Sequence, residues 1–181
     1  LHRVILALGL TLAAGCDDGA PEASGGPCVP GTPAVLAPVA GWHQAAATED
    51  PFADHRPTEP DCPPYAITVE GHSLEVDTAA CDYVTLVQAL PEAIAPCDTL
   101  GLDLAHLDLR APEPAEAHLA VAVAGEVVWA RQIPIPSTQQ VYEVRWALPE
   151  GAPAGTPVAV HLHNHGENSW YIGDLRRSPA R

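Results

Sequence analysis

Three histidines at alternating positions form the densest group of side chains in this sequence that could carry chemistry. They are His161, His163 and His165, and Glu167 follows two residues later. Side chains two residues apart on a β-strand point to the same face, about 6.5 Å from one another. Imidazole nitrogens and carboxylate oxygens are ligands for transition metals. These residues are therefore our candidate metal or ligand residues, with His161 and His163 as the pair that could share one ion.

A structural interpretation of the same histidines competes with the functional one. The apolar residues that alternate with them between Val158 and Leu162 predict a strand whose other face is buried. The histidines would then be an outward polar face, and the Asn- and Gly-containing stretch 164–168 would form the turn after the strand. His106 and His118 could add ligands from neighbouring strands, but the sequence alone does not fix their positions.

Aromatic side chains offer a second kind of site, because carbohydrate-binding modules of jelly-roll fold stack sugar rings on exposed Trp and Tyr. Trp129 and Trp146 are in phase with aliphatic residues, so we expect both in the core. Trp170 and Tyr171 are adjacent and must point to opposite faces of an extended strand. Tyr171 is out of phase with Ile172, and it is our candidate for stacking against a ligand.

Charge and motifs argue against several functions. The net charge is −15 and the only adjacent basic residues are Arg176 and Arg177, so a nucleic-acid partner is not expected. The sequence lacks the G-x-S-x-G and H-E-x-x-H motifs of hydrolases. An enzyme is therefore not our leading hypothesis, and we predict no cofactor other than a transition metal at His161 and His163.

The elements that position these residues are predicted to be β-strands. From residue 66 onward, short alternating runs are separated by Gly, Pro and Asp, and no long helical pattern occurs. This texture predicts an all-β fold, an antiparallel two-sheet β-sandwich of jelly-roll type over residues 66–175. The predicted strands are Ala66–Val69, Ser73–Asp77, Tyr83–Gln88, Thr99–Leu109, His118–Val123, Glu126–Ile133, Val141–Leu148, Val158–His163 and Ser169–Leu175.

The phase of individual strands gives finer predictions. The apolar phase of residues 99–109 shifts by one near Ala105-His106, which predicts a β-bulge there. Val127 and Trp129 are expected on one buried face. The alternate alanines of residues 120–124 predict that a second layer packs closely over them.

The histidine stretch resembles part of the first motif of the cupin family. That motif brings a His-x-His pair and a Glu to a metal ion inside a jelly roll, and Gly155, His161, His163 and Glu167 match its spacing. The resemblance implies a metal-dependent enzyme with this histidine pair as ligands. The second cupin motif, which supplies another histidine, has no counterpart, because the eight residues after Gly173 contain no histidine.

The N-terminus resembles the signal peptide of a bacterial lipoprotein. His2 and Arg3 precede an apolar run, and small residues lead to Cys16, as in a lipobox. The resemblance implies cleavage after residue 15 and acylation of Cys16. The exported protein would then be lipid-anchored to a bacterial membrane on its periplasmic or cell-surface side, with the lipid bilayer as a partner. An ordinary signal peptide that leaves Cys16 unmodified is the alternative.

The other four cysteines predict two disulfides in an exported chain. If the chain folds back in a hairpin at Glu70-Gly71, Cys62 meets Cys81, and Cys28 is left to pair with Cys97. This is the pairing that we favour. Sequence-local pairing, Cys28–Cys62 with Cys81–Cys97, is the rival.

Residues 16–64 are predicted to be a Pro/Gly-rich tether. Ten of the twenty prolines fall there, and proline interrupts both helices and strand ladders. Trp42 and Phe52 could dock onto the domain, but we favour an extended tether. Residues 1–15 are then the signal peptide and residues 176–181 a C-terminal tail.

These features favour a membrane-anchored exported lipoprotein whose β-sandwich is a binding or surface-structural module for a glycan or protein ligand. The whole sequence resembles small jelly-roll lipoproteins of unassigned function. Two alternatives stay open: a carbohydrate-binding module that uses Tyr171, and a metal-dependent, cupin-like enzyme that uses the histidines of residues 161–165.

Overall fold

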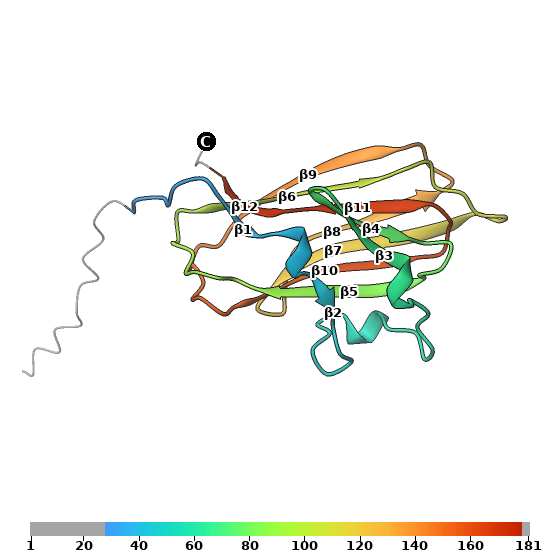
Figure 1. The fold of residues 1–181 in the computed structure, drawn as a ribbon, viewed down its shortest axis with the longest axis horizontal. Coiled ribbons are helices and arrows are strands. Elements are labelled where there is room, and N and C mark those ends of the chain that lie inside the picture. Colours follow the sequence, from blue (N-terminus) through green and yellow to red (C-terminus); the bar gives the residue numbers. More distant parts are fainter. Residues whose placement is uncertain (1–27, 179–181) are drawn as a thin grey trace, which may run out of the picture.

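The computed structural model describes residues 28–178, which form two antiparallel β-sheets packed as a β-sandwich (Figure 1). The fold is all-β, as predicted. The helical pieces among the described residues are three short 3-10 turns: η1 (Val39–Gly41), η2 (Ala53–His55) and η3 (Pro64–Ala66). The predicted signal peptide and Cys16 lie outside the described residues. Within residues 28–178, no helix has the length and apolar character needed to cross a membrane.

Eight central strands form a long hairpin that is rolled up on itself. They are β4 (Ser73–Asp77), β5 (Tyr83–Ala89), β6 (Thr99–His106), β7 (Ala115–Val123), β8 (Glu126–Ile135), β9 (Gln140–Ala147), β10 (Pro157–Asn164) and β11 (Ser169–Gly173). The first strand pairs with the last and so on inward: β4 with β11, β5 with β10, β6 with β9, and β7 with β8. Rolling brings β10 beside β7 and β11 beside β6. This arrangement confirms the predicted jelly roll.

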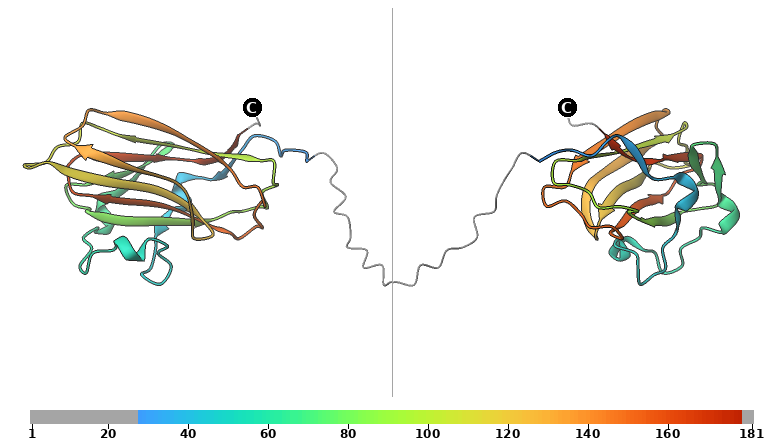
Figure 2. Two further views of the ribbon diagram at one scale, coloured as in Figure 1. Left: turned by 180° about the vertical axis from the view of Figure 1, so that it is seen from behind. Right: turned by 60° about the vertical axis from the view of Figure 1, so that its left-hand side comes forward.

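Four further strands extend the two sheets. They are β1 (Ala34–Ala37), β2 (His43–Gln44), β3 (Ile67–Glu70) and β12 (Leu175–Ser178). The five-stranded sheet has the order β2-β5-β10-β7-β8. The seven-stranded sheet has the order β1-β12-β6-β11-β4-β3, with β9 also paired to β6. Figure 2 shows the two layers, and the start of the described chain lies at the same end of the sandwich as β12.

The core lies between the sheets and takes alternate residues from each strand. On β10, Val158, Val160 and Leu162 are at most 2% exposed and belong to the core cluster, which confirms the predicted alternation. Trp146 and Trp170 are buried on the opposite sheet. The alternating residues of β10 and β11 therefore point out of the sandwich, and these outer faces carry the chemistry.

The predicted tight hairpin at Glu70-Gly71 is present, and a second tight hairpin joins β7 to β8. Gly71 follows β3 with a φ of 61°, and the β7–β8 turn places Ala124 and Gly125 at φ values of 52° and 85°. Positive φ at both central residues, as at Ala124 and Gly125, is the requirement of a type I′ hairpin, in which a glycine avoids steric strain.

The prediction of a tether over residues 16–64 is wrong from residue 34 onward. β1 pairs with β12 and β2 pairs with β5, and Leu36, Val39 and Trp42 are buried in the core. Proline is compatible with short edge strands and 3-10 turns, so a proline-rich composition did not prevent docking. Residues 16–27 of the predicted tether lie outside the described range.

The predicted C-terminal tail also begins too early, because β12 continues to Ser178. In β12, Arg176 pairs with Gly101 and Arg177 pairs with Leu100 of β6. We predicted that both arginines belong to a solvated tail. Arg177 is instead buried, and it forms the ion pairs described below.

The predicted bulge near Ala105-His106 is wrong, because β6 pairs with β9 without a register shift from Thr99 to His106. His106 points inward and is 2% exposed. Its Nδ1 lies 2.7 Å from the Leu107 carbonyl oxygen and its Nε2 lies 3.1 Å from the Tyr142 hydroxyl. Because both ring nitrogens have partners, a polar residue can occupy an inward position.

A register shift instead occurs between β7 and β8, at Val121-Ala122. It separates Val127 from Trp129, which were expected on one buried face. Val127 is 55% exposed, whereas Trp129 is partly buried against the core. One extra residue reverses the faces on either side of it, so the phase of the β8 sequence is misleading.

The favoured disulfide pairing is confirmed. Cys28 is bonded to Cys97, and Cys62 is bonded to Cys81, with Cα–Cα distances of 5.9 Å and 4.0 Å. Two disulfides fit a chain that is exported to an oxidising compartment.

An ion-pair cluster closes the end of the sandwich at which the described chain begins. Arg177 Nε lies 3.2 Å from Asp98 Oδ2, and Arg177 Nη2 lies 2.9 Å from Glu92 Oε1. Asp98 also accepts the backbone N–H groups of Gly31 at 2.7 Å and Ala95 at 2.9 Å. Burial alone would raise the pKa of Asp98, but these hydrogen bonds and the Arg177 charge outweigh it and hold the pKa below its ordinary value.

Replacing Asp98 should destabilise the fold in a pH-dependent way. At neutral pH, Asp98→Ala leaves Arg177 with one carboxylate and should lower the free energy of unfolding by about 3–5 kcal/mol. Because the folded pKa of Asp98 is depressed, its contribution is present above the unfolded value of about 3.9 and is lost as the pH falls. Denaturant titrations should therefore show a large difference from the wild type at pH 7 and a smaller one at pH 3. Glu150→Ala, which alters an exposed carboxylate, is the control and should be as stable as the wild type. If Asp98→Ala is also as stable as the wild type at pH 7, this role for Asp98 is contradicted.

Candidate functional site

The outer face of the five-stranded sheet is covered by residues 45–61, which we call the covering segment. Figure 1 shows it in cyan, running along the body beside β5. Phe52, which is 5% exposed, packs over Ala120, Ala122 and Ala159 in a second apolar cluster outside the main core. The close second layer predicted from the alternating alanines is therefore present, and the segment read as tether supplies it.

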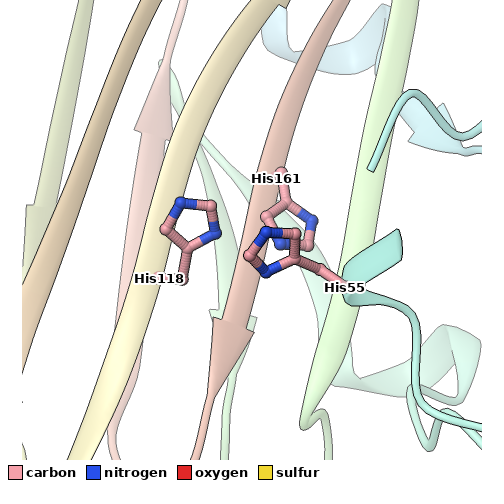
Figure 3. Close-up of side chains that lie close together, drawn as sticks. All are labelled: His55, His118 and His161. Atoms are coloured by element: carbon pink, nitrogen blue, oxygen red, sulfur yellow. The ribbon is translucent and has the colours of Figure 1, made fainter. Parts of the chain in front are cut away.

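Three histidines meet where the covering segment crosses the sheet. His118 comes from β7, His161 from β10 and His55 from η2, and Figure 3 shows their rings close together. One ring nitrogen from each histidine lies within 4.8 Å of those of the other two. His161 is fully buried, His118 is partly buried and His55 is exposed. The exposure of the three side chains therefore increases from His161 on the sheet to His55 at the solvent.

Hydrogen bonds fix the tautomer of His161. The Thr85 hydroxyl donates to Asp50 Oδ1 at 2.8 Å, and Thr85 Oγ1 lies 3.0 Å from His161 Nδ1. Since the only proton of the hydroxyl goes to the carboxylate, Thr85 can only accept from His161, so Nδ1 carries the ring proton. Nε2 is left with its lone pair, and it is buried without a hydrogen-bond partner among the described residues.

The pKa values show that this face favours neutral imidazoles. Burial first, and then the neighbouring His118, lower the pKa of His161 to about 3. Burial and His55 lower the pKa of His118, and burial and His165 lower that of His163. At neutral pH the nitrogens of His118 and His161 are therefore available as lone-pair donors.

The carboxylate of Asp50 holds the covering segment on the sheet. Its Oδ2 accepts the Tyr83 hydroxyl at 2.7 Å and Arg56 Nη1 at 3.0 Å, and its Oδ1 accepts the Phe52 N–H at 2.9 Å besides Thr85. Burial alone would raise the pKa of Asp50, but these donors, Tyr83 foremost, lower it. Asp50 is therefore a buried, ionised hub that joins the segment to β5.

Aromatic contacts fill the rest of the cluster. The Phe52 ring stacks on His161 with centroids 4.4 Å apart, and the His55 ring stacks on His118 at 4.6 Å. The Tyr83 ring meets His161 edge-on at 5.0 Å. These contacts place His55 and Phe52, from the covering segment, directly on the histidines of the sheet.

The sequence-predicted ligands do not all converge. The His163 ring lies 4.5 Å from the ring of the exposed His165, at an interplanar angle of 55°, beyond the three-histidine cluster. Glu167 forms an isolated backbone β-bridge with Arg110, and it lines a separate acidic pocket with Glu75. Of the four candidates, only His161 enters the cluster, so the predicted His161–His163 pair with Glu167 is not assembled.

The cupin-like hypothesis, in which the histidine pair binds a metal ion inside the jelly roll, is also wrong. In the structure, His161 and His163 point out of the jelly roll, because the inward positions of β10 are taken by Val158, Val160 and Leu162. A cupin-type ion would need histidines that point into the barrel. His118 was recognised only as a possible neighbour, and His55 was missed because it follows prolines in the presumed tether.

Tyr171, the predicted stacking residue, lies on the outer face of the other sheet. It is paired with Ala105 of β6 on one side and with Glu75 of β4 on the other, and Ala105 is paired with Val141 of β9. A groove of about 270 Å³ runs beside the ring, with Gln140 among its lining residues. As predicted, Tyr171 points away from the core, opposite to Trp170.

Comparisons with known proteins support the fold. No model of a known protein family matches the chain, and no curated protein matches it either. Among solved structures it is similar to TmCBM27, a carbohydrate-binding module studied for specific mannan recognition, at 11% identity and a TM-score of 0.50. That alignment covers 83% of this chain and 96% of the module. At this identity the likeness shows a shared β-sandwich fold.

A second similar structure is a cleaved adhesin domain of Lys-gingipain from Porphyromonas gingivalis. It has 13% identity and a TM-score of 0.49, with 82% of this chain and all (100%) of that domain covered.

Asp50 can be tested as the anchor of the covering segment. Asp50→Ala removes an acceptor from four donors, and hydrogen bonds to a charged group are worth about 1.5–3 kcal/mol each. We expect the segment to detach while the sheets persist, so exchange of the Ala45 amide, which donates to the Thr85 carbonyl oxygen at 2.7 Å, should rise about tenfold or more without a change in the core strands. Asp54→Ala, an exposed carboxylate in the same segment, is the control. Unchanged exchange of the Ala45 amide in Asp50→Ala would show that Asp50 is not the anchor.

Proposed function

We propose that the protein is an exported, lipid-anchored binding module whose seven-stranded sheet binds a neutral polysaccharide over Tyr171. The observation that carries the proposal is the Tyr171 ring, which lies half-buried on an outer sheet face beside an open groove. An aromatic face and nearby amide and carboxylate groups are what a sugar ring needs, because its C–H faces are apolar and its rim carries hydroxyls.

The row of residues across the sheet supplies these groups in order. Val141, which is 67% exposed, and the small Ala105 leave space on one side of Tyr171. Gln139 and Gln140, at the same side of the groove, offer amide donors and acceptors. On the other side, the Tyr171 hydroxyl lies 3.5 Å from Glu75 Oε1, which leaves further acceptor capacity for a sugar hydroxyl.

Charge restricts the class of glycan. The chain has a net charge of −15, and Glu75 lies beside the ring, so an anionic polysaccharide would be repelled. The likeness in fold to a mannan-recognising module is compatible with a neutral glycan but does not identify one. We therefore assign the ligand class from the groove and its charge.

The proposed membrane anchor rests on the lipobox-like residues before Cys16. Acylation there, followed by residues 17–27, would place the β-sandwich close to a membrane surface. The two disulfides support export.

Glycan binding can be measured by affinity electrophoresis in native gels that contain mannan, a mixed-linked β-glucan or an acidic polysaccharide. We expect at least one neutral polymer, but not the acidic one, to retard the wild type. Tyr171→Ala should weaken retardation about tenfold or more, a loss of roughly 1.4 kcal/mol. Tyr65→Ala, which alters a tyrosine that is 76% exposed elsewhere, should behave like the wild type.

The glycan proposal would be contradicted if no neutral polymer retards the folded wild type, as expected for a purely structural surface protein. It would also fail if Tyr171→Ala and Tyr65→Ala bind equally well.

The lipid anchor can be tested separately. In a bacterial host, Cys16→Ser should abolish incorporation of labelled fatty acid and move the protein from the membrane fraction to the soluble fraction. Cys16 unlabelled in the wild type, with the protein already soluble, would exclude the anchor without affecting the glycan proposal.

A further inference from the structure

We propose that His55, His118 and His161 bind a divalent transition-metal ion, such as Zn²⁺ or Cu²⁺, between the covering segment and the five-stranded sheet. The site is separate from the proposed glycan groove, because the two lie on the outer faces of opposite sheets. Three histidines from three elements place their nitrogens within 4.8 Å of one another (Figure 3).

Two nitrogens of the cluster lack partners in the described part of the chain. His161 Nε2 and His118 Nδ1 are both buried without a hydrogen bond. Buried polar atoms are nearly always paired, so each of these needs an explanation. A metal ion would satisfy both lone pairs at once, because unprotonated imidazole nitrogens are what a transition metal binds.

The surroundings of His161 suit a metal ligand. Histidines that bind a metal usually donate their other ring N–H to a group that fixes the orientation of the ring. Here Nδ1–H donates to Thr85, which in turn donates to the buried carboxylate of Asp50. Asp50 is occupied by four donors, so it supports the ligand from behind and does not itself reach the ion.

A small movement would close the site. Two nitrogens bound to one tetrahedral ion lie about 3.3 Å apart, for metal–nitrogen distances of about 2.0–2.1 Å. The stacked rings of His55 and His118 are nearly parallel, at 16°, so one ring must rotate for both lone pairs to meet the ion. His55 is exposed at the end of the three-residue turn η2, and its side chain can rotate without disturbing the sheet.

The donor set defines the class of ion. Three neutral imidazoles without a thiolate suit Zn²⁺, Cu²⁺ and Ni²⁺, with Cu²⁺ bound most tightly, and do not suit Ca²⁺ or Mg²⁺. Three protein ligands leave a fourth position, on the exposed side of His55, for water. Because His55 belongs to the covering segment and the other two to the sheet, the ion would also tie the segment down.

Metal binding should be measured on the detergent-solubilised, tag-free protein after treatment with a chelator. Equilibrium dialysis against Zn²⁺ and Cu²⁺ should give one tightly bound ion per chain, and the melting temperature should rise with the metal concentration. Ca²⁺ should have no such effect. No tight binding of Zn²⁺ or Cu²⁺ by the folded wild type would overturn the proposal.

Three variants locate the ion. His55→Ala alters an exposed residue, so it should fold and yet bind Zn²⁺ about 100-fold more weakly. Thr85→Val should weaken binding about 10–100-fold, because the orientation of His161 is lost. His72→Ala changes a histidine whose side chain is 92% exposed on the β3–β4 hairpin, and it should bind like the wild type.

His165→Ala distinguishes this site from the alternative in which His161, His163 and His165 of β10 and the following turn hold the ion. We expect it to leave the affinity for Zn²⁺ unchanged. If His165→Ala abolishes binding while His55→Ala does not, the ion is held by the alternating histidines and our assignment is wrong. Loss of metal binding in His55→Ala with intact glycan retardation would confirm that the two sites are independent.

Discussion

The buried carboxylate of Asp50 is the constraint on which the histidine face depends. An ionised group in such a position is tolerated only when several donors surround it. Asp50 meets this requirement with donors from its own segment, Phe52 and Arg56, and from β5, Tyr83 and Thr85. Satisfying one charge therefore docks a proline-rich segment onto the sheet, and docking brings His55 to the histidines of the sheet.

Asp50 and its neighbours also determine the protonation and the solvent exposure of His161. Through Thr85, Asp50 sets which nitrogen of His161 is protonated, and Phe52, which follows it by two residues, shields the His161 ring from solvent. Among residues 28–178, no comparable segment covers Tyr171 on the opposite sheet, and its groove is open. A jelly roll thus presents two outer faces of different character, one closed and rich in imidazole, the other open and aromatic.

Much of the fold could be predicted because it follows from local alternation. The period of two in β10 identified the buried valines and the outward histidines, and the hairpin at Gly71 correctly favoured the Cys62–Cys81 pairing. His106 misled the prediction because its polarity hides an inward position that hydrogen bonds make acceptable. Val127 misled it because a single extra residue in β8 reverses the faces.

The site was only partly predictable, because its parts are far apart in sequence. His55 lies 106 positions before His161 (161 − 55) and within a stretch whose prolines suggested a tether. A signal was present, since Asp50, Phe52 and His55 place a carboxylate, the only Phe of the chain and an imidazole within six residues. Recognising them required knowing that the alanines of β7 leave room for Phe52, which is a property of the packed sheet.

The tautomer and charge of His161 test this account most directly. Long-range ¹H–¹⁵N correlation NMR of the metal-free protein reports which ring nitrogen carries the proton. The account predicts a neutral ring protonated at Nδ1, unchanged from pH 8 to pH 5, because burial depresses its pKa and Thr85 accepts the Nδ1 proton. A ring protonated at Nε2, or one that titrates near the ordinary histidine pKa of about 6.5, would contradict it.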